Sequence, residues 1–217
     1  MNILFVGNSY THRNDLEKIF EELCRENGRA VSADRVTVGG RKMIQFTDPE
    51  DPVTQQLEVA LEEKHYDVVF LQDHSLQPLL DFDAFAAGMQ YVGKKVSALK
   101  PQIILYATWA RKVGSPDLET YGWTPEGMTR MLDTAYRKVA QILGVAVSPV
   151  GISFHKAIAL APDIELYDPD MYHPSYLGSC LAALTHYVTL FGTYPERTAS
   201  LSLDENILSV FQAAVCA

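Results

Sequence analysis

The sequence has few cysteines, and no two of them stand at a metal-binding spacing. Its three cysteines, Cys24, Cys180 and Cys216, are odd in number and far apart. This arrangement does not suit a disulfide framework, and the lack of a Cys-x-x-Cys pair removes support for a zinc ribbon or a thioredoxin-type site. Cys24 and Cys180 lie in helix-like apolar patterns, so we expect them to be buried thiols.

Long apolar runs and an excess of positive charge are also missing. No stretch approaches 18 apolar residues, which predicts no membrane span. Residues 1–7 have no basic segment and too short an apolar run for a signal peptide, so we predict a cytoplasmic location. The chain has 18 Lys and Arg against 27 Asp and Glu, a net charge of −9. That balance disfavours binding to nucleic acid or to an anionic membrane.

What the sequence does contain is the composition of a globular protein. Its 217 residues are 47% hydrophobic and 21% charged, which suits a single domain over residues 1–217 that folds without disulfides or metal. Strand-length apolar runs alternate with amphipathic segments of helical length. The expected strands are 3–6, 31–38, 67–71, 102–108 and 145–147, and the expected helices are 15–26, 54–64, 82–99, 125–143 and 175–191.

This order predicts an α/β fold, a three-layer α/β/α sandwich around a doubly wound parallel sheet of about five strands. Asn14 is expected to cap the first helix and Asn27-Gly28 to end it. The segment 113–125 is the longest expected loop and a candidate lid. In such sheets the ligand lies beyond the carboxyl ends of the strands, so the residues that directly follow each strand are the informative ones.

Ser9 follows the first expected strand and stands at the start of a helix. A serine there has a free backbone N–H, which suits a nucleophile because the same N–H can stabilise an oxyanion. The alternative is an ordinary turn or capping serine. The pattern Gly-x-Ser-x-Gly is absent, because Gly7-Asn8-Ser9-Tyr10-Thr11 and Gly151-Ile152-Ser153-Phe154-His155 both miss its last glycine. This argues against the α/β-hydrolase fold.

Asp170 and His173 stand three residues apart in a loop before the last expected helix. A serine nucleophile needs a base, and a histidine base needs a carboxylate that fixes its tautomer, so this segment can supply both. Helix capping by the same residues is an alternative. A metal cluster of Asp168, Asp170 and His173 is another, although no further His or Cys spacing supports it.

Further polar residues follow the second, third and fourth strands. Gly39-Gly40 can bring backbone N–H groups close to a ligand or form a plain turn. Gln72 can offer its amide to an oxyanion, and His74 reads as a supporting residue or a substrate contact. We expect substrate contacts from Asn8, Ser75, Trp109 and Arg111, with surface packing as the alternative for the last two. The remaining histidines, at positions 12, 65, 155 and 186, read as surface or hydrogen-bonded helix residues.

Taken together, these positions resemble the SGNH hydrolases, also called the GDSL esterase/lipase superfamily. The segment 3–11 resembles its first block, with Asn8 where Asp is usual and Tyr10 where Leu is usual. Gly39 or Gly40 matches the second block, and Asp170 to His173, followed by Pro174, matches the last. The usual Gly-x-Asn of the third block is absent. There Gln72 resembles the substitute in a branch that contains carbohydrate acetylesterases, with Ser75 and Gln77 as alternatives.

The resemblance covers residues 3–191 and implies a flavodoxin-like fold and two-step acyl transfer. Ser9 would be the nucleophile, His173 the base and Asp170 the residue that orients it. The oxyanion donors would be the N–H groups of Ser9 and of Gly39 or Gly40, with the side chain of Gln72. No cofactor or metal is implied, and the partner would be a small-molecule ester with a short acyl group, such as an acetyl group on a sugar.

Two other functions stay open at this point. The altered first and third blocks allow a non-catalytic module that binds a carbohydrate or an ester on the same fold. Asp168, Asp170 and His173 allow a metal-dependent phosphoesterase, although the additional ligands that two-metal chemistry needs are missing. The sequence does not separate esterase, thioesterase and transferase activity, because all three use the same groups.

Overall fold

Five short strands form one parallel sheet, as the alternating pattern predicted. The computed structural model describes residues 1–216, and its strands are β1 (Asn2–Gly7), β2 (Ser32–Thr37), β3 (Val68–Leu71), β4 (Gln102–Tyr106) and β5 (Ala146–Ser148). They pair in the order β2-β1-β3-β4-β5, and every pairing is parallel. The chain leaves β1 toward one edge and returns to its other side at β3. The loops that follow β1 and β3 therefore meet at the switch point, where sheets of this kind bind ligands.

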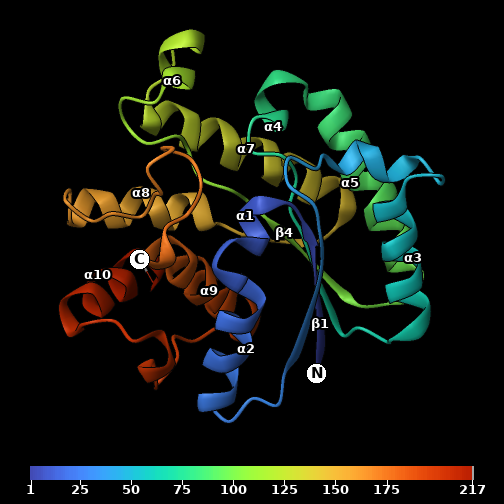
Figure 1. Cartoon of the computed structure of the whole chain (residues 1–217), viewed down its shortest axis with the longest axis horizontal. Coiled ribbons are helices and arrows are strands. Elements are labelled where there is room, and N and C mark those ends of the chain that lie inside the picture. The colour runs from blue at the N-terminus through green and yellow to red at the C-terminus, as the bar shows by residue number, and fades with distance from the viewer. Residues whose placement is uncertain (217) are drawn as a thin grey trace.

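Helices cover both faces of this sheet (Figure 1). On one face, α2 (Leu16–Glu26) and α9 (Tyr176–Phe191) pack against the sheet, and α8 (Val150–Leu160) and α10 (Glu205–Cys216) pack against α9 in the same hydrophobic cluster. The other face packs against α3 (Pro52–Glu63), α5 (Phe82–Ser97) and α7 (Pro125–Leu143). The predicted three-layer α/β/α sandwich is confirmed.

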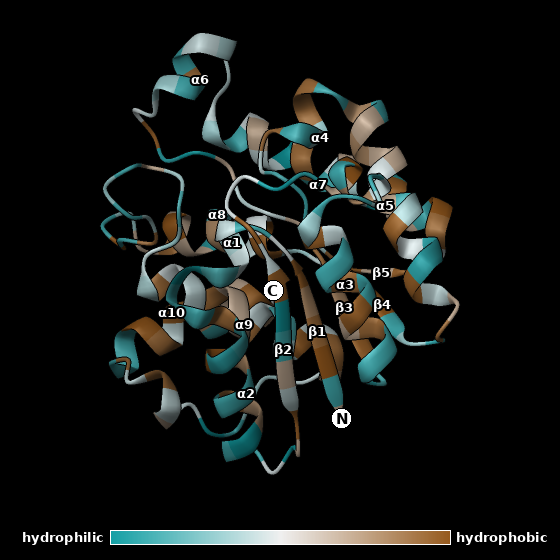
Figure 2. Ribbon diagram, turned by 45° about the vertical axis from the view of Figure 1, so that its right-hand side comes forward, coloured by the Kyte–Doolittle hydropathy of each residue, from teal (hydrophilic) through white to brown (hydrophobic). Residues whose placement is uncertain are grey.

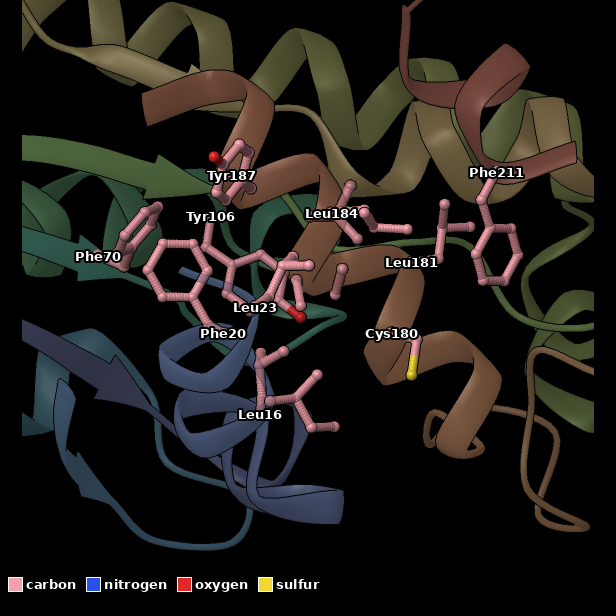
Figure 3. Packing of buried hydrophobic residues seen from close by; sticks show 14 of the residues in the cluster. Leu16, Phe20, Leu23, Phe70, Tyr106, Cys180, Leu181, Leu184, Tyr187 and Phe211 are labelled. Atoms are coloured by element: carbon pink, nitrogen blue, oxygen red, sulfur yellow. The ribbon is translucent and has the colours of Figure 1, made fainter. Parts of the chain in front are cut away.

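The larger core lies between the sheet and the α2–α9 pair (Figure 3). Leu16, Phe20 and Leu23 recur along α2 at helical spacing and are fully buried. Phe20 meets Phe5 of β1 edge-on, with ring centroids 5.7 Å apart, and Phe5 stacks on Phe70 of β3 at 4.7 Å. Each such side chain contributes roughly 1.5–3 kcal/mol by leaving water. This packing fixes β1, whose last residues carry the start of the site.

The two neighbouring strands β1 and β2 differ in polarity (Figure 2). Five of the six residues of β1 are buried, whereas Val36 is the one buried residue of β2. The β2 residue Asp34 forms an ion pair with Lys64 at 2.5 Å. Charged side chains on an edge strand discourage pairing with another chain. The polar composition of β2 therefore matches its place at the edge of the sheet.

The first helical turn differs from the expectation. A short helix, α1 (Ser9–His12), directly follows β1, and a 3₁₀ turn, η1 (Arg13–Asp15), connects it to α2. Asn14 does not cap α2, because its backbone is left-handed, with φ 56°. Its side-chain amide instead donates to the carbonyl of Pro174 at 3.1 Å and to Ser179 Oγ at 2.9 Å. Asn14 thus ties the first turn to the first turn of α9 and to the residue Pro174 that precedes this helix.

The helix boundaries divide into those with local end signals and those without. Helix α7 begins and ends where Pro125 and Gly144 predicted, and Asn27 and Gly28 end α2. The expected loop 113–125 instead contains α6 (Pro116–Tyr121). Also unpredicted were α8, α10, the short α4 (Gln77–Leu80) and the 3₁₀ turns η2 (Met43–Thr47) and η3 (Ala199–Leu201). Within residues 1–216, no helix has the length and apolar character needed to cross a membrane. Cys24 and Cys180 are buried free thiols, as expected.

Candidate active site

The turn after β1 presents Ser9 at the mouth of the sheet. A Cβ atom at Gly7 would lie 2.5 Å from Gln72 Oε1, so only glycine fits where the strand meets this turn. Asn8 Oδ1 accepts a hydrogen bond from Tyr10 N at 3.1 Å and thereby caps α1. Ser9 is the first residue of α1 and is half-buried. Its backbone N–H has no acceptor among residues 1–216, so it is free to donate to a bound group.

Asp170 and His173 form a compact turn opposite Ser9. Asp170 Oδ2 lies 2.6 Å from His173 Nδ1. Its other oxygen, Oδ1, accepts backbone hydrogen bonds from His173 N at 2.9 Å and Tyr172 N at 3.1 Å. Met171, between them, has a left-handed φ of 69°. The three-residue spacing thus lets one carboxylate hold both the ring and the backbone of His173.

The two segments meet in one hydrogen-bonded line. His173 Nε2 lies 2.8 Å from Ser9 Oγ, across 164 residues of sequence. Partial burial raises the pKa of Asp170, but hydrogen bonds from the side chain and backbone of His173 and from Tyr172 N outweigh it and lower the pKa overall. The ionised carboxylate favours the proton on Nδ1 of His173, which leaves Nε2 as an acceptor toward Ser9. The site can therefore draw a proton from the Ser9 hydroxyl.

Gly39 and Gly40 form an exposed turn beside the Ser9 turn. Arg41 N donates to the carbonyl of Val38 at 3.2 Å and closes it, and Gly40 has a φ of 70° that favours glycine. Asn8 Nδ2 donates to the carbonyl of Arg41 at 2.9 Å, which ties the two turns together. Within residues 1–216, the N–H groups of both glycines have no acceptor. They are available to a ligand held at Ser9.

Gln72 lies beneath Ser9 and not at the surface of the site. Its side chain is 1% exposed, and its Oε1 accepts from Asn8 N and from Thr11 Oγ1, both at 3.0 Å. Its Nε2 donates to Asn8 Oδ1 at 3.0 Å and to the carbonyl of Asp73. Both amide hydrogens are therefore used inside the protein. This arrangement does not match the oxyanion donor expected at Gln72, and it makes Gln72 the support of the Ser9 turn.

The four expected substrate contacts are also turned inward, which corrects the sequence expectation. Trp109 is 0% exposed, and its Nε1 donates to the carbonyl of Tyr172 at 3.0 Å. Asn8 and Ser75 are buried, and Ser75 Oγ accepts from Arg111 at 3.0 Å. Arg111 is 4% exposed and also donates to Asp117 Oδ2 at 2.6 Å. In this structure the four side chains hold neighbouring segments together and do not face an open ligand site.

Aromatic residues beside Ser9 and His173 were missed by the sequence reasoning. Tyr10 stacks on Trp109 with ring centroids 4.6 Å apart, and its hydroxyl accepts from Arg111 at 2.5 Å. The guanidinium of Arg111 lies 4.9 Å from the ring centre of Tyr172, which in turn lies 4.3 Å from the His173 ring. Burial raises the pKa of Tyr10 to about 12, so its hydroxyl stays neutral. The buried guanidinium of Arg111 thus contacts both Tyr10, next to Ser9, and Tyr172, next to His173.

The contacts that Arg111 and Trp109 make with Tyr10 and Tyr172 had only a weak signal in the sequence. Tyr10 and Tyr172 each stand beside a predicted catalytic residue, and Arg111 follows a strand. Adjacency alone does not say which way a side chain turns. The contacts that decide it, Arg111 to Tyr10 and Trp109 to Tyr172, join residues that are 101 and 63 positions apart.

The described residues do not assemble a metal-ligand cluster. Within residues 1–216, no group of three His, Cys, Asp or Glu side chains is placed to hold a metal ion. Asp168, which the metal alternative requires, lies 3.2 Å from Arg13 and forms an ion pair with it. Asp170 faces His173, and His173 faces Ser9. The donor geometry that the phosphoesterase alternative needs is therefore missing from these residues.

Comparisons with solved structures agree with this fold. A proposed SGNH hydrolase from Slackia heliotrinireducens shares 27% identity, with a TM-score of 0.78 over 88% of this chain and 98% of that one. A DUF4886 family protein from Bacteroides uniformis has a TM-score of 0.83 at 18% identity, over 99% of this chain and 93% of that one. An acetyl xylan esterase, AlAXEase, has a TM-score of 0.68 at 16% identity, over 88% and 100% of the two chains. The sequence matches no protein-family model and no curated protein.

The fold and these similarities define a class of protein. The parallel sheet with helices on both faces is the α/β fold of the SGNH hydrolases. The chain belongs to the SGNH hydrolase superfamily, and at this level it is a hydrolase.

Proposed function

We propose that this protein is a serine esterase that works through an acyl-enzyme. The observation that carries the proposal is the line from Ser9 Oγ through His173 to Asp170, with contacts of 2.8 and 2.6 Å. A hydroxyl, an imidazole and a carboxylate in this order are what nucleophilic acyl transfer requires. The free N–H groups of Ser9, Gly39 and Gly40 support the proposal, because an acyl-transfer site needs donors for the developing oxyanion.

In the first half of the reaction, Ser9 Oγ attacks the carbonyl carbon of the ester. His173 Nε2 takes the hydroxyl proton, while Asp170 holds the ring by its Nδ1–H. The carbonyl oxygen becomes an oxyanion that accepts from Ser9 N–H and from the glycine turn. When the tetrahedral intermediate collapses, the bond to the alcohol oxygen breaks and His173 returns the proton to that oxygen.

In the second half, water replaces the alcohol. His173 takes a proton from the water, whose oxygen attacks the acyl carbon on Ser9. Collapse of the second intermediate breaks the bond to Ser9 Oγ, which recovers its proton from His173. The acid leaves and the enzyme returns to its starting state. None of these steps needs a cofactor, so we expect activity to survive a metal chelator.

We propose a short acyl group, such as acetyl on a carbohydrate, as the substrate class. Two structural neighbours are described as an acetyl xylan esterase and an acetyl-xylooligosaccharide esterase, with TM-scores of 0.68 and 0.65. The cytoplasmic location stays a prediction.

The test is hydrolysis of p-nitrophenyl esters of increasing chain length, with EDTA present. We expect turnover to be fastest for acetate and to fall in Ser9→Ala by about 10³-fold or more, because no other group replaces the nucleophile. The matched control is Ser153→Ala. Ser153 belongs to the other near-miss motif and is buried within α8, so its loss should leave kcat unchanged.

Three outcomes would count against the esterase. Wild-type turnover that Ser9→Ala leaves intact would show that Ser9 is a turn residue. Turnover that EDTA removes would favour the metal-dependent alternative. Tight binding of an acetylated oligosaccharide without turnover on any ester would favour the non-catalytic binding module.

A further inference from the structure

The proposed reaction leaves the third oxyanion donor unassigned, because the amide hydrogens of Gln72 are used beneath Ser9. Ser75 lies near, but its Oγ is held by Arg111 and is buried. Gln77 lies further along, on α4, and is also buried. His74 remains, and it differs from all three because it is half-exposed at the end of the β3 segment.

Hydrogen bonds place His74 beside both the Ser9 turn and the glycine turn. Gln72, two residues before His74, accepts a hydrogen bond from the backbone N–H of Asn8, which precedes Ser9. Asp73, the residue directly before His74, accepts from Met43 N at 2.9 Å, just beyond the glycine turn. The same Asp73 oxygen, Oδ1, accepts from His74 N at 2.6 Å and fixes the backbone there. Since Asn8 also holds the carbonyl of Arg41, these hydrogen bonds tie the three segments to one another.

The ring of His74 is held in one orientation with a defined tautomer. Leu76 N donates to His74 Nδ1 at 3.3 Å, so Nδ1 is an acceptor and the ring proton of the neutral form is on Nε2. Burial, followed by the nearby charges of Arg111 and Lys42, lowers the pKa of His74, which keeps the ring neutral at neutral pH. His74 Nε2 has no hydrogen-bond partner in the part of the chain that the structure describes. The segment that follows β3 therefore carries an N–H donor that no described residue uses.

We propose that His74 Nε2–H is the third oxyanion donor of this site, in the place expected for Gln72. The inference rests on the proposed esterase function. In the tetrahedral intermediate the oxyanion would accept from Ser9 N–H, from the glycine turn and from His74. A side chain that donates only to the charge that develops there raises kcat and leaves substrate binding nearly unchanged.

The test compares three variants that separate the two ring nitrogens. His74→Gln carries an amide near the place of Nε2, His74→Asn carries its polar atoms near the place of Nδ1, and His74→Ala carries neither. We expect His74→Ala and His74→Asn to lower kcat on p-nitrophenyl acetate by about 10²-fold, with KM within about threefold. His74→Gln should recover most of that loss. Thermal unfolding of each variant checks that the fold is intact.

A structural role of His74 gives the opposite pattern. If the bond from Leu76 N is what matters, His74→Asn restores activity and His74→Gln does not, which overturns the proposal. It is also overturned if His74→Ala stays within about threefold of wild type while Ser9→Ala is inactive. Absence of Ser9-dependent turnover in the wild type would overturn the esterase itself, and this inference with it.

A spectroscopic measurement tests the same contact without turnover. In ¹⁵N-histidine-labelled protein, the His74 ring signals should report the Nε2–H tautomer. After Ser9 is modified by a p-nitrophenyl alkylphosphonate, whose phosphoryl oxygen mimics the oxyanion, the His74 Nε2 proton should move downfield. A Nδ1–H tautomer, or a Nε2 proton that does not shift in the adduct, would contradict the assignment.

Discussion

The molecule contains two Ser–His hydrogen bonds of nearly equal length. Ser9 Oγ lies 2.8 Å from His173 Nε2, and Ser148 Oγ lies 2.7 Å from His186 Nδ1. Both serines end or follow a strand of the same sheet, and both histidines come from the C-terminal third of the chain. The distance alone therefore does not tell a reactive serine from a structural one.

The surroundings of the two pairs differ in every other respect. His186 is fully buried on α9, with its ring among those of Phe5, Phe70 and Tyr106. Among residues 1–216 no carboxylate faces it, and its Nε2 has no hydrogen-bond partner. His173 has Asp170 on its Nδ1 and meets Ser9, just beyond the carboxyl end of β1, through its Nε2.

The environment of each histidine, and not the length of its hydrogen bond to serine, decides whether the pair can transfer a proton. A proton taken by His186 would create a charge in an apolar cage, and burial lowers the pKa of His186 to about 3. A proton taken by His173 is stabilised by an ionised Asp170, and Ser9 has free N–H groups beside it. Substitutions at Asp170, Arg111 and His186 test this contrast.

Asp170→Asn should have the largest effect of the three. The substitution keeps the size of the side chain, but it removes the charge that favours the Nδ1–H tautomer of His173. We expect kcat on p-nitrophenyl acetate to fall by about 10³–10⁴-fold with little change in thermal stability. The matched control is Asp168→Asn in the same loop, where a surface ion pair with Arg13 is lost. A similar fall in both variants would point to a loop effect and away from Asp170 as the orienting group.

Arg111→Lys should have an intermediate effect, because it keeps the positive charge but removes the planar guanidinium with its several N–H donors. A single ammonium does not reach Tyr10, Ser75 and Asp117 together. We expect kcat to fall by roughly 10-fold, because Tyr10 and Tyr172 lose their contacts with the Arg111 guanidinium. The change in KM should be smaller. Asp117→Asn keeps an acceptor for Arg111 and should change kcat by less than about threefold. Equal effects on kcat and on KM in Arg111→Lys would instead favour a direct substrate contact.

The sequence was sufficient where the signals are local. Helix α7 was predicted from end to end because Pro125 and Gly144 mark both of its ends. Helix α8 was missed because Gly151, Ser153 and His155 interrupt its apolar pattern, and α6 is too short to show a period. The capping role of Asn14 was wrong because its amide bonds to residues 160 and 165 positions away.

The same limit applies to the site. Ser9, Asp170 and His173 were chosen because each lies beyond a strand or in a turn, and chain order brings such residues to one edge of the sheet. The directions of Gln72, Trp109 and Arg111 depend on contacts 63 to 101 residues apart, such as Gln72 with Asn8, 64 positions away, and Arg111 with Tyr10. No periodicity or motif carries that information, so inward-facing residues were expected to face the substrate.

His186 gives the smallest effect, and it concerns stability and not activity. Its pKa is depressed in the folded protein, so the unfolded chain binds the extra proton below its ordinary pKa near 6.5. Stability from this residue is therefore complete above that pH and is lost as the pH falls toward 3. At pH 4.5, which is two units below the ordinary pKa of histidine, the loss in the free energy of unfolding is about 2–3 kcal/mol. His186→Asn removes the titrating group and keeps an amide near Ser148.

Urea unfolding at pH 7 and pH 4.5 measures this difference. We expect His186→Asn to be less stable than wild type at pH 7, because a smaller side chain leaves a cavity among the aromatic rings. Its further loss between pH 7 and pH 4.5 should be smaller than that of wild type by about 2–3 kcal/mol. An equal pH-dependent loss in the two proteins would mean that His186 is protonated in the folded state. The apolar surroundings of His186 would then not be what distinguishes its pair with Ser148 from the proposed catalytic pair.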